Sequence, residues 1–158
     1  ADMESGVDVE LEIPRDTVLN LRTSNGLVSI DGDEIGVHGS IAVHVDNGQV
    51  VLANIHSSVS VLAERSPIFF DGVPTSGSQI RLATTGQPIF VASDMLDDVR
   101  IDAESTAGNI RFTLPSGQNS DVLDRPASLV IGDPKAMLHL RTSSAEIAII
   151  PVESIPFP

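Results

Sequence analysis

A twelve-residue pattern that occurs six times constrains this chain more than any other feature of its sequence. Positions 1 and 3 are apolar, position 5 is small or β-branched, turn residues stand at 7 and 8, and positions 10 and 12 are apolar. The copies begin 18–22 residues apart, except for a last gap of 39, at Leu19, Ile41, Val59, Ile80, Val99 and Leu138. A repeat of this length indicates supersecondary units that stack on one another.

The residue types indicate that these units are built from strands. Val and Ile are abundant, whereas neither Trp nor Tyr occurs. β-branched side chains lose rotamer freedom in helices and pack well on pleated sheets. Gly and Pro between the short apolar runs supply turns, and no stretch keeps a helical period for long. We therefore expect an all-β protein.

Two all-β folds fit the pattern, a parallel β-solenoid and a chain of antiparallel hairpins packed as a sandwich or prism. Asn25-Gly26 and Asn47-Gly48 are strong hairpin signals. Pro67 and Pro88, however, stand where a two-residue hairpin needs a backbone N–H, and proline has none. We therefore favour the solenoid, with about seven coils of roughly 20 residues, and keep the hairpin fold as the alternative.

The same pattern organises the chain as one domain over residues 1–150. An alternating strand over 7–13 is expected to cap the first coil, and residues 19–113 to form five coils. Residues 127–150 are expected to hold the last coils, one of them degenerate. Residues 151–158 form an apolar, proline-rich C-terminal tail.

Two segments of the sequence resemble the repeats of a known family. They are Leu-Asn-Leu-Arg-Thr-Ser-Asn-Gly-Leu-Val-Ser-Ile at 19–30 and Leu-His-Leu-Arg-Thr-Ser-Ser-Ala-Glu-Ile-Ala-Ile at 138–149. With the Ile-Pro-Arg-Asp turn at 13–16, they resemble repeats of the bacterial and archaeal adhesin-like family, a domain-of-unknown-function group. The likeness covers roughly residues 7–150. It implies a single-stranded right-handed parallel β-helix that is secreted or displayed at the cell surface.

The two ends of such a stack are open sheet edges, which a protein either caps or uses to bind another chain. We therefore expect self-association, as a homo-oligomer or as a filament formed by end-to-end stacking. The candidate assembly residues are the apolar ones near the two termini, Val7, Val9, Leu11, Ile13, Ile149, Ile150, Ile155 and Phe157.

The charge of the chain indicates which other classes of partner it can bind. The formal net charge of −13 argues against nucleic acid and anionic lipid, and no apolar run is long enough to insert into a membrane. Four arginines nevertheless share one outward face of the repeat and form a candidate basic face for an acidic partner, Arg22, Arg81, Arg100 and Arg141. A glycan- or protein-binding module that uses this face is the alternative function.

The sequence holds few motifs that are typical of catalytic, metal-binding or phosphate-binding sites. There is no Cys, the four His lack metal-binding spacing, and no nucleophile elbow or phosphate loop occurs. Calcium is the one cofactor that the sequence favours at all, because carboxylates gather in two inter-coil loops, Asp31, Asp33 and Glu34 in one, and Asp94, Asp97 and Asp98 in the other. We expect no catalytic site and no required cofactor. A polysaccharide-active enzyme is the least favoured function, because aromatic platforms for sugar rings are missing.

The sequence thus predicts a non-catalytic, structural or adhesin-like extracellular protein. Its expected partners are further copies of itself, or a surface glycan or protein.

Overall fold

The computed structural model describes residues 18–32, 39–94, 96–113, 119–122 and 127–157. Within these ranges the chain is all-β, as predicted, and contains no α-helix. Twelve strands join in one hydrogen-bonded sheet, and a short 3-10 helix, η2 (Val152–Ser154), follows the last strand. The strands are β1 (Val18–Asp31), β2 (Ser40–Ile55), β3 (Ser58–Ala63), β4 (Ile68–Gly72), β5 (Gln79–Thr84), β6 (Ile89–Ala92), β7 (Val99–Ser105), β8 (Ile110–Thr113), β9 (Asn119–Val122), β10 (Ala127–Ile131), β11 (Ala136–Thr142) and β12 (Ile147–Ile150).

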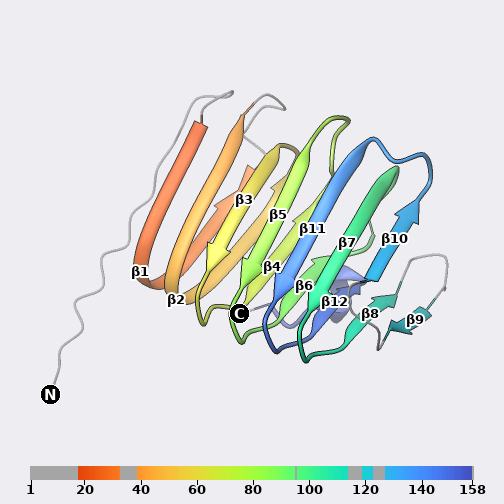
Figure 1. The fold of residues 1–158 in the computed structure, drawn as a ribbon. Helices are drawn as coiled ribbons and strands as arrows, with labels where there is room; N and C mark the ends of the chain where they lie inside the picture. The colour runs from red at the N-terminus through yellow and green to blue at the C-terminus, as the bar shows by residue number, and fades with distance from the viewer. Residues whose placement is uncertain (1–17, 33–38, 95, 114–118, 123–126, 158) are drawn as a thin grey trace, which may run out of the picture.

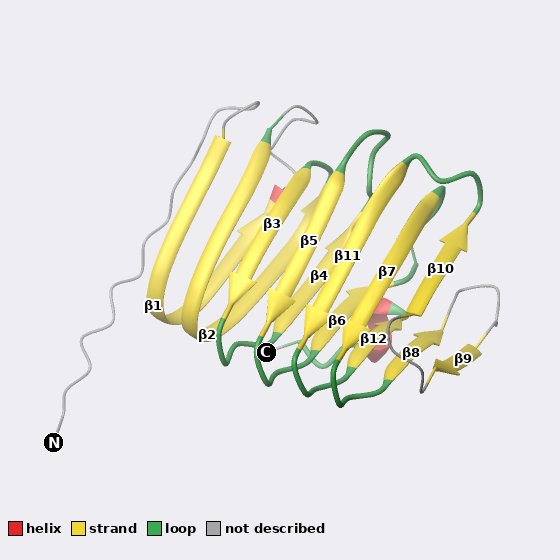
Figure 2. Ribbon diagram, viewed as in Figure 1, coloured by secondary structure: helices red, strands yellow, loops and turns green. Residues whose placement is uncertain are grey.

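The sheet bends back over itself, so that a front half and a back half face each other (Figure 1). The long strands β1 and β2 turn at their Asn-Gly corners and run through both halves (Figure 2). Beyond them, the front half continues as β3, β5, β11, β7 and β10, and the back half as β4, β6, β12, β8 and β9. The two strands of one repeat therefore lie in opposite halves and do not form a hairpin.

Equivalent positions of the first four copies of the repeat pair in parallel. Leu19 of β1 pairs with Ile41 of β2, Ile41 with Val59 of β3, and Val59 with Ile80 of β5. The prolines lie at corners, where the carbonyl of Pro67 accepts a hydrogen bond from the Val50 N–H (3.0 Å). A corner proline thus contributes its acceptor to the ladder although it lacks the donor.

The predicted single-stranded right-handed parallel β-helix of about seven coils is wrong. The sheet is mixed, because β10 pairs antiparallel with β7 and β9 pairs antiparallel with β8. The last repeat is also out of order: β11 lies between β5 and β7, and β12 lies between β6 and β8. The degenerate coil expected near residues 127–131 is the antiparallel edge strand β10.

The physical reason for the error is that the repeat determines which side chains face inward but not which copy is their neighbour. Each copy presents the same alternating apolar face, so any two copies bury similar side chains when they pair in parallel. A long connection separates β8 from β11, and this length of chain allows β11 to reach a place between two earlier strands.

The hydrophobic core lies between the two halves. Its largest fully buried side chains come from both, and include Leu52, Phe70, Ile80, Ile101, Leu140 and Ile147. Small hydroxyl residues end the front strands: Thr84 Oγ1 donates to the Ser66 carbonyl (2.7 Å), and Thr142 Oγ1 donates to the Gln87 carbonyl (2.8 Å). In these two copies, position 5 of the repeat therefore supplies a hydrogen-bond donor for a carbonyl in a neighbouring corner.

The C-terminal tail covers the outer side of the back half. Ile155 packs there with Phe69, and the Phe69 ring stacks on Phe90 with centroids 5.4 Å apart. The Phe157 ring lies 5.8 Å from Phe69 and remains 39% exposed. This small second cluster buries Ile155, whereas Val152 and Phe157 of the tail stay exposed.

Candidate functional site

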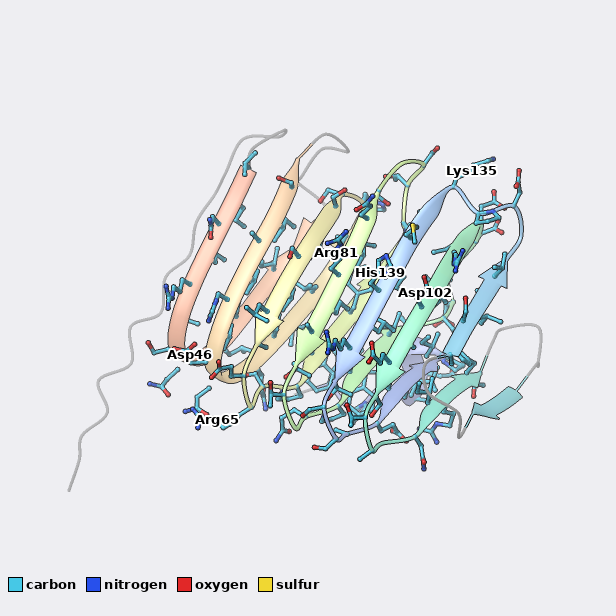
Figure 3. The ribbon with its side chains drawn as sticks, in the orientation of Figure 1. Asp46, Arg65, Arg81, Asp102, Lys135 and His139 are labelled. Atoms are coloured by element: carbon cyan, nitrogen blue, oxygen red, sulfur yellow. The ribbon has the colours of Figure 1, made fainter. Side chains whose placement is uncertain are left out.

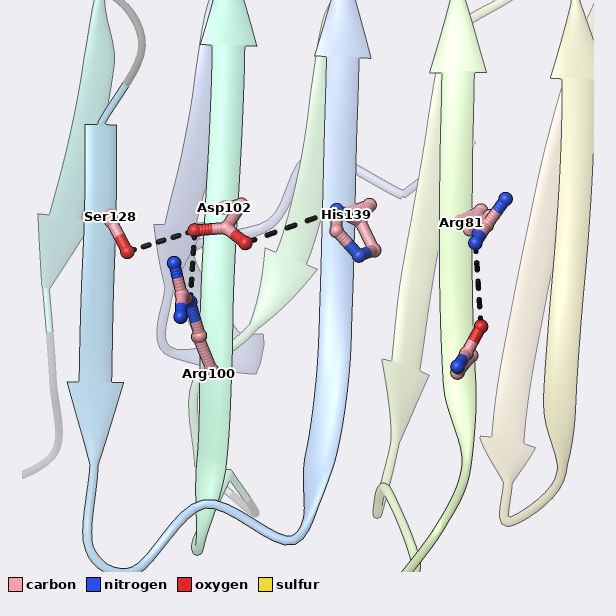
Figure 4. Close-up of polar contacts among 6 residues, drawn as sticks. Arg81, Arg100, Asp102, Ser128 and His139 are labelled. Carbon is pink, nitrogen blue, oxygen red and sulfur yellow. Dashed lines mark hydrogen bonds and ion pairs between the residues drawn. The ribbon is translucent and has the colours of Figure 1, made fainter.

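The outer surface of the front half carries a row of polar side chains across four strands. Arg81 of β5, His139 of β11 and Asp102 of β7 are neighbours in register, and Ser128 of β10 follows (Figure 3, Figure 4). In-register strands about 4.8 Å apart place such side chains in a ladder.

Asp102 is the centre of the row (Figure 4). Its Oδ1 accepts hydrogen bonds from Ser128 Oγ (2.8 Å) and Arg100 Nε (3.3 Å), and its Oδ2 lies 4.0 Å from His139 Nδ1. Burial alone would raise the pKa of Asp102, but these hydrogen bonds and the nearby positive charge lower it below its ordinary value of 3.8. Asp102 is therefore ionised at neutral pH.

The arrangement does not provide a nucleophile. A catalytic serine needs a base on its own hydroxyl, with the acid behind that base. Here Ser128 donates directly to Asp102, and the carboxylate lies between the serine and His139. The geometry fixes side chains on a surface and is suited to binding.

A shallow groove of about 430 Å³ crosses the strands beside this row. One wall is the polar row from Arg81 to Asp102, and the other wall carries Ala83, Arg141 and Glu104. The small side chain of Ala83, directly opposite Arg141 in register, leaves a hollow at one end of the groove. Arg81 and Arg141 lie on the two strands nearest this hollow, whereas Asp102 and Glu104 line the other end of the groove on β7.

The structure divides the predicted basic face. Arg81, Arg100 and Arg141 lie on the neighbouring strands β5, β7 and β11. Arg22 is exposed on the same outer face but lies on β1, at the end of the sheet. Acidic residues interrupt the face, since Arg100 pairs with Asp102 and Arg141 is the register neighbour of Glu104.

The predicted assembly residues do not form an exposed surface in the described part of the chain, apart from Phe157. Val7, Val9, Leu11 and Ile13 lie outside the described residues. Ile149 is completely buried in the core. Ile150 and the tail residue Ile155 are buried together in the second cluster, so these side chains contact their own chain.

The acidic loops do not assemble a calcium site in the described residues. Asp33 and Glu34 lie outside them, and Asp31 accepts a hydrogen bond from Asn54 (3.1 Å). Asp98 is engaged by the Asp133 N–H (3.0 Å) and by the Lys135 ammonium (3.6 Å). No three His, Cys, Asp or Glu side chains of the described ranges gather where they could hold a metal ion.

The free edge of β1 is a second candidate site, and it was not among the predicted residues. β1 pairs with β2 along both halves of the sheet, and no described strand pairs with its other side. Leu21 and Val28 are only half-buried, whereas their partners Val43 and Val50 in β2 are 3% and 0% exposed. The inner face of β1 is thus uncovered on one side.

A signal for this edge was present in the sequence. Protected edge strands carry inward charges, prolines or bulges. The inward positions of β1 hold the same apolar residues as those of the interior repeats, including Leu19, Leu21 and Val28.

No protein-family model, characterised protein or solved structure matches this chain. Among the described residues there is also no helix with the length and apolar character needed to cross a membrane.

Proposed function

We propose that this protein is a non-catalytic structural module, acting at or outside the cell surface, that associates with a second copy of itself through the edge of β1. The observation that carries the proposal is the outer edge of this 14-residue strand, which runs along both halves of the sheet and pairs with no described strand. Exposed strand edges bind further strands through their free backbone donors and acceptors. The extracellular location rests on the resemblance to the adhesin-like family.

The shape of the edge favours a second copy as the partner. A two-fold axis brings β1 of each copy antiparallel to the other, so the two edges match in length and in their pattern of inward side chains. Such pairing would cover Leu19, Leu21 and Val28, and would bring exposed Val18 and Leu27 (73% and 59%) close to the partner. Backbone pairing and apolar burial would therefore act together.

Sedimentation over a range of concentrations tests this function with two lysine variants of β1. Leu21→Lys places a charge on the inward side of the edge, where a paired strand would have to bury it, and we expect at least a tenfold weaker dimer. Asn20→Lys adds the same charge to the adjacent exposed position and should leave the dimer intact. Circular dichroism melts establish that both variants are folded at the temperature used.

A strictly monomeric wild-type protein at high concentration would contradict the proposal, and would fit an edge covered by another segment of the same chain. Filaments in place of dimers would retain self-association but would reject the two-fold arrangement in favour of head-to-tail contacts.

A further inference from the structure

The hollow over Ala83 concentrates positive charge on a strongly acidic protein. Arg81 precedes Ala83 by two residues on β5, Arg141 is its register partner on β11, and His139 lies diagonally across. Diagonal neighbours of this kind lie about 7–8 Å apart at their backbones, within reach of arginine side chains. The Arg81 guanidinium is directed toward Gln79 in this structure, and a change of its side-chain rotamer would allow Arg81 and Arg141 to contact one small group placed above Ala83.

The two arginines nearest the hollow, Arg81 and Arg141, have no ion-pair partner among the described residues. Arg81 donates a hydrogen bond to the amide oxygen of Gln79 (3.4 Å). Arg100, by contrast, is paired with Asp102. Planar guanidinium groups with free donors are well suited to a carboxylate.

The far end of the groove offers acceptors. Asp102 Oδ1 accepts hydrogen bonds from Ser128 and Arg100, whereas the one described partner of Oδ2 is His139, at 4.0 Å. Glu104 is exposed on the same strand and lines the groove. Ionised carboxylates accept hydrogen bonds from hydroxyl groups, and they repel a second anionic group.

We propose that this groove binds an acidic glycan through one carboxylate-bearing sugar unit. The carboxylate lies over Ala83 between Arg81 and Arg141, and hydroxyl groups of the same or the next sugar donate to Asp102 and Glu104. Leu62, 53% exposed and the register partner of Ala83 on its other side, offers apolar surface to the C–H groups of the sugar. The groove volume of about 430 Å³ suits a ligand of this size.

An acidic peptide fits less well. Peptides that bind sheets usually pair with a free strand edge. The floor of this groove is formed at Leu82, Leu140 and Ala103, on strands that are already paired on both sides. A densely sulfated glycan is also disfavoured, because Asp102 and Glu104 would face its additional charges.

The test is a titration of the full chain with a galacturonic acid trisaccharide, followed by NMR, against a neutral galactose trisaccharide. We expect saturable binding of the acidic sugar alone, with Arg81→Gln and Arg141→Gln each weakening it roughly tenfold. Arg22→Gln is the matched control, since Arg22 is an exposed arginine on the same outer face outside the groove, and this variant should bind as wild type.

Equal binding of the neutral sugar, or unchanged affinity in both groove variants, would overturn the site. Tighter binding of a sulfated trisaccharide or of a glutamate-rich peptide would overturn the assignment to a carboxylate sugar. Because Arg81 and Arg141 are remote from the β1 edge, the dimer should persist in both variants, so failure here is distinguishable from failure of the self-association proposal.

Discussion

Replacing Val43 with aspartate should prevent folding. Val43 lies in the second repeat, is 3% exposed and belongs to the main core. The substitution removes apolar burial worth about 1.5–3 kcal/mol and buries a carboxylate at a further cost of several kcal/mol. Small domains are stable by only about 5–15 kcal/mol, so the combined loss removes most or all of the stability. Far-UV circular dichroism and a thermal melt measure the result.

The matched control is Ser60→Asp, which adds the same side chain to an exposed, outward position of the neighbouring strand β3. This variant should melt within a few degrees of the wild type, because surface substitutions usually change stability by less than about 0.5 kcal/mol. Similar melting of Val43→Asp and Ser60→Asp would show that the assignment of inward and outward positions is wrong.

Substitution of Gly48 by alanine should detach β1 at its corner. A Cβ atom at Gly48 would meet the carbonyl oxygen, carbonyl carbon and nitrogen of Gly26 in the neighbouring corner, all of them backbone atoms. The two Asn-Gly corners are in register, so neither can move away without breaking the β1–β2 ladder. We expect a loss of about 1–3 kcal/mol, as for other overpacked sites.

Hydrogen exchange locates this loss, because protection should fall in β1 before it falls in the interior strands. Gln49→Ala is the control, since it also introduces alanine next to the corner but adds no atom beside Gly26. Uniform protection in Gly48→Ala, with an unchanged melting temperature, would mean that the corners are not stacked as described.

The local pattern of the fold was predictable from the sequence, whereas the order of the strands was not. The alternation at Ile41, Val43 and Val45 identifies buried positions, and the structure confirms them as 0–3% exposed. The same alternation recurs in Leu138 and Leu140, so it cannot distinguish whether the last repeat pairs with the fourth, with the fifth or with both. The predicted sequential stack failed at this point.

The candidate groove also depends on the order of the strands, which the sequence does not determine. The sequence identified Arg81 and Arg141 as outward residues, but their convergence requires β11 to lie beside β5. In a sequential stack that pairs equivalent repeat positions, Asp102 would be the register neighbour of Ala83, and the hollow would be acidic on that side. The edge of β1, in contrast, was recognisable in principle from its unprotected apolar positions.

The position of the last repeat is therefore the central claim, and engineered disulfides test it most directly in a chain without native cysteine. Met137 is the register partner of Gln79, and neighbouring strands lie about 4.8 Å apart, within the Cα range of about 4.4–6.8 Å for disulfides. Gln79 and Arg100 are separated by an intervening strand, about 9.6 Å in all. Under mild oxidation, followed by mass spectrometry of peptides, the cysteine pair at 79 and 137 should cross-link within the monomer, and the pair at 79 and 100 should not. Cross-linking of 79 with 100, and none of 79 with 137, would contradict the account.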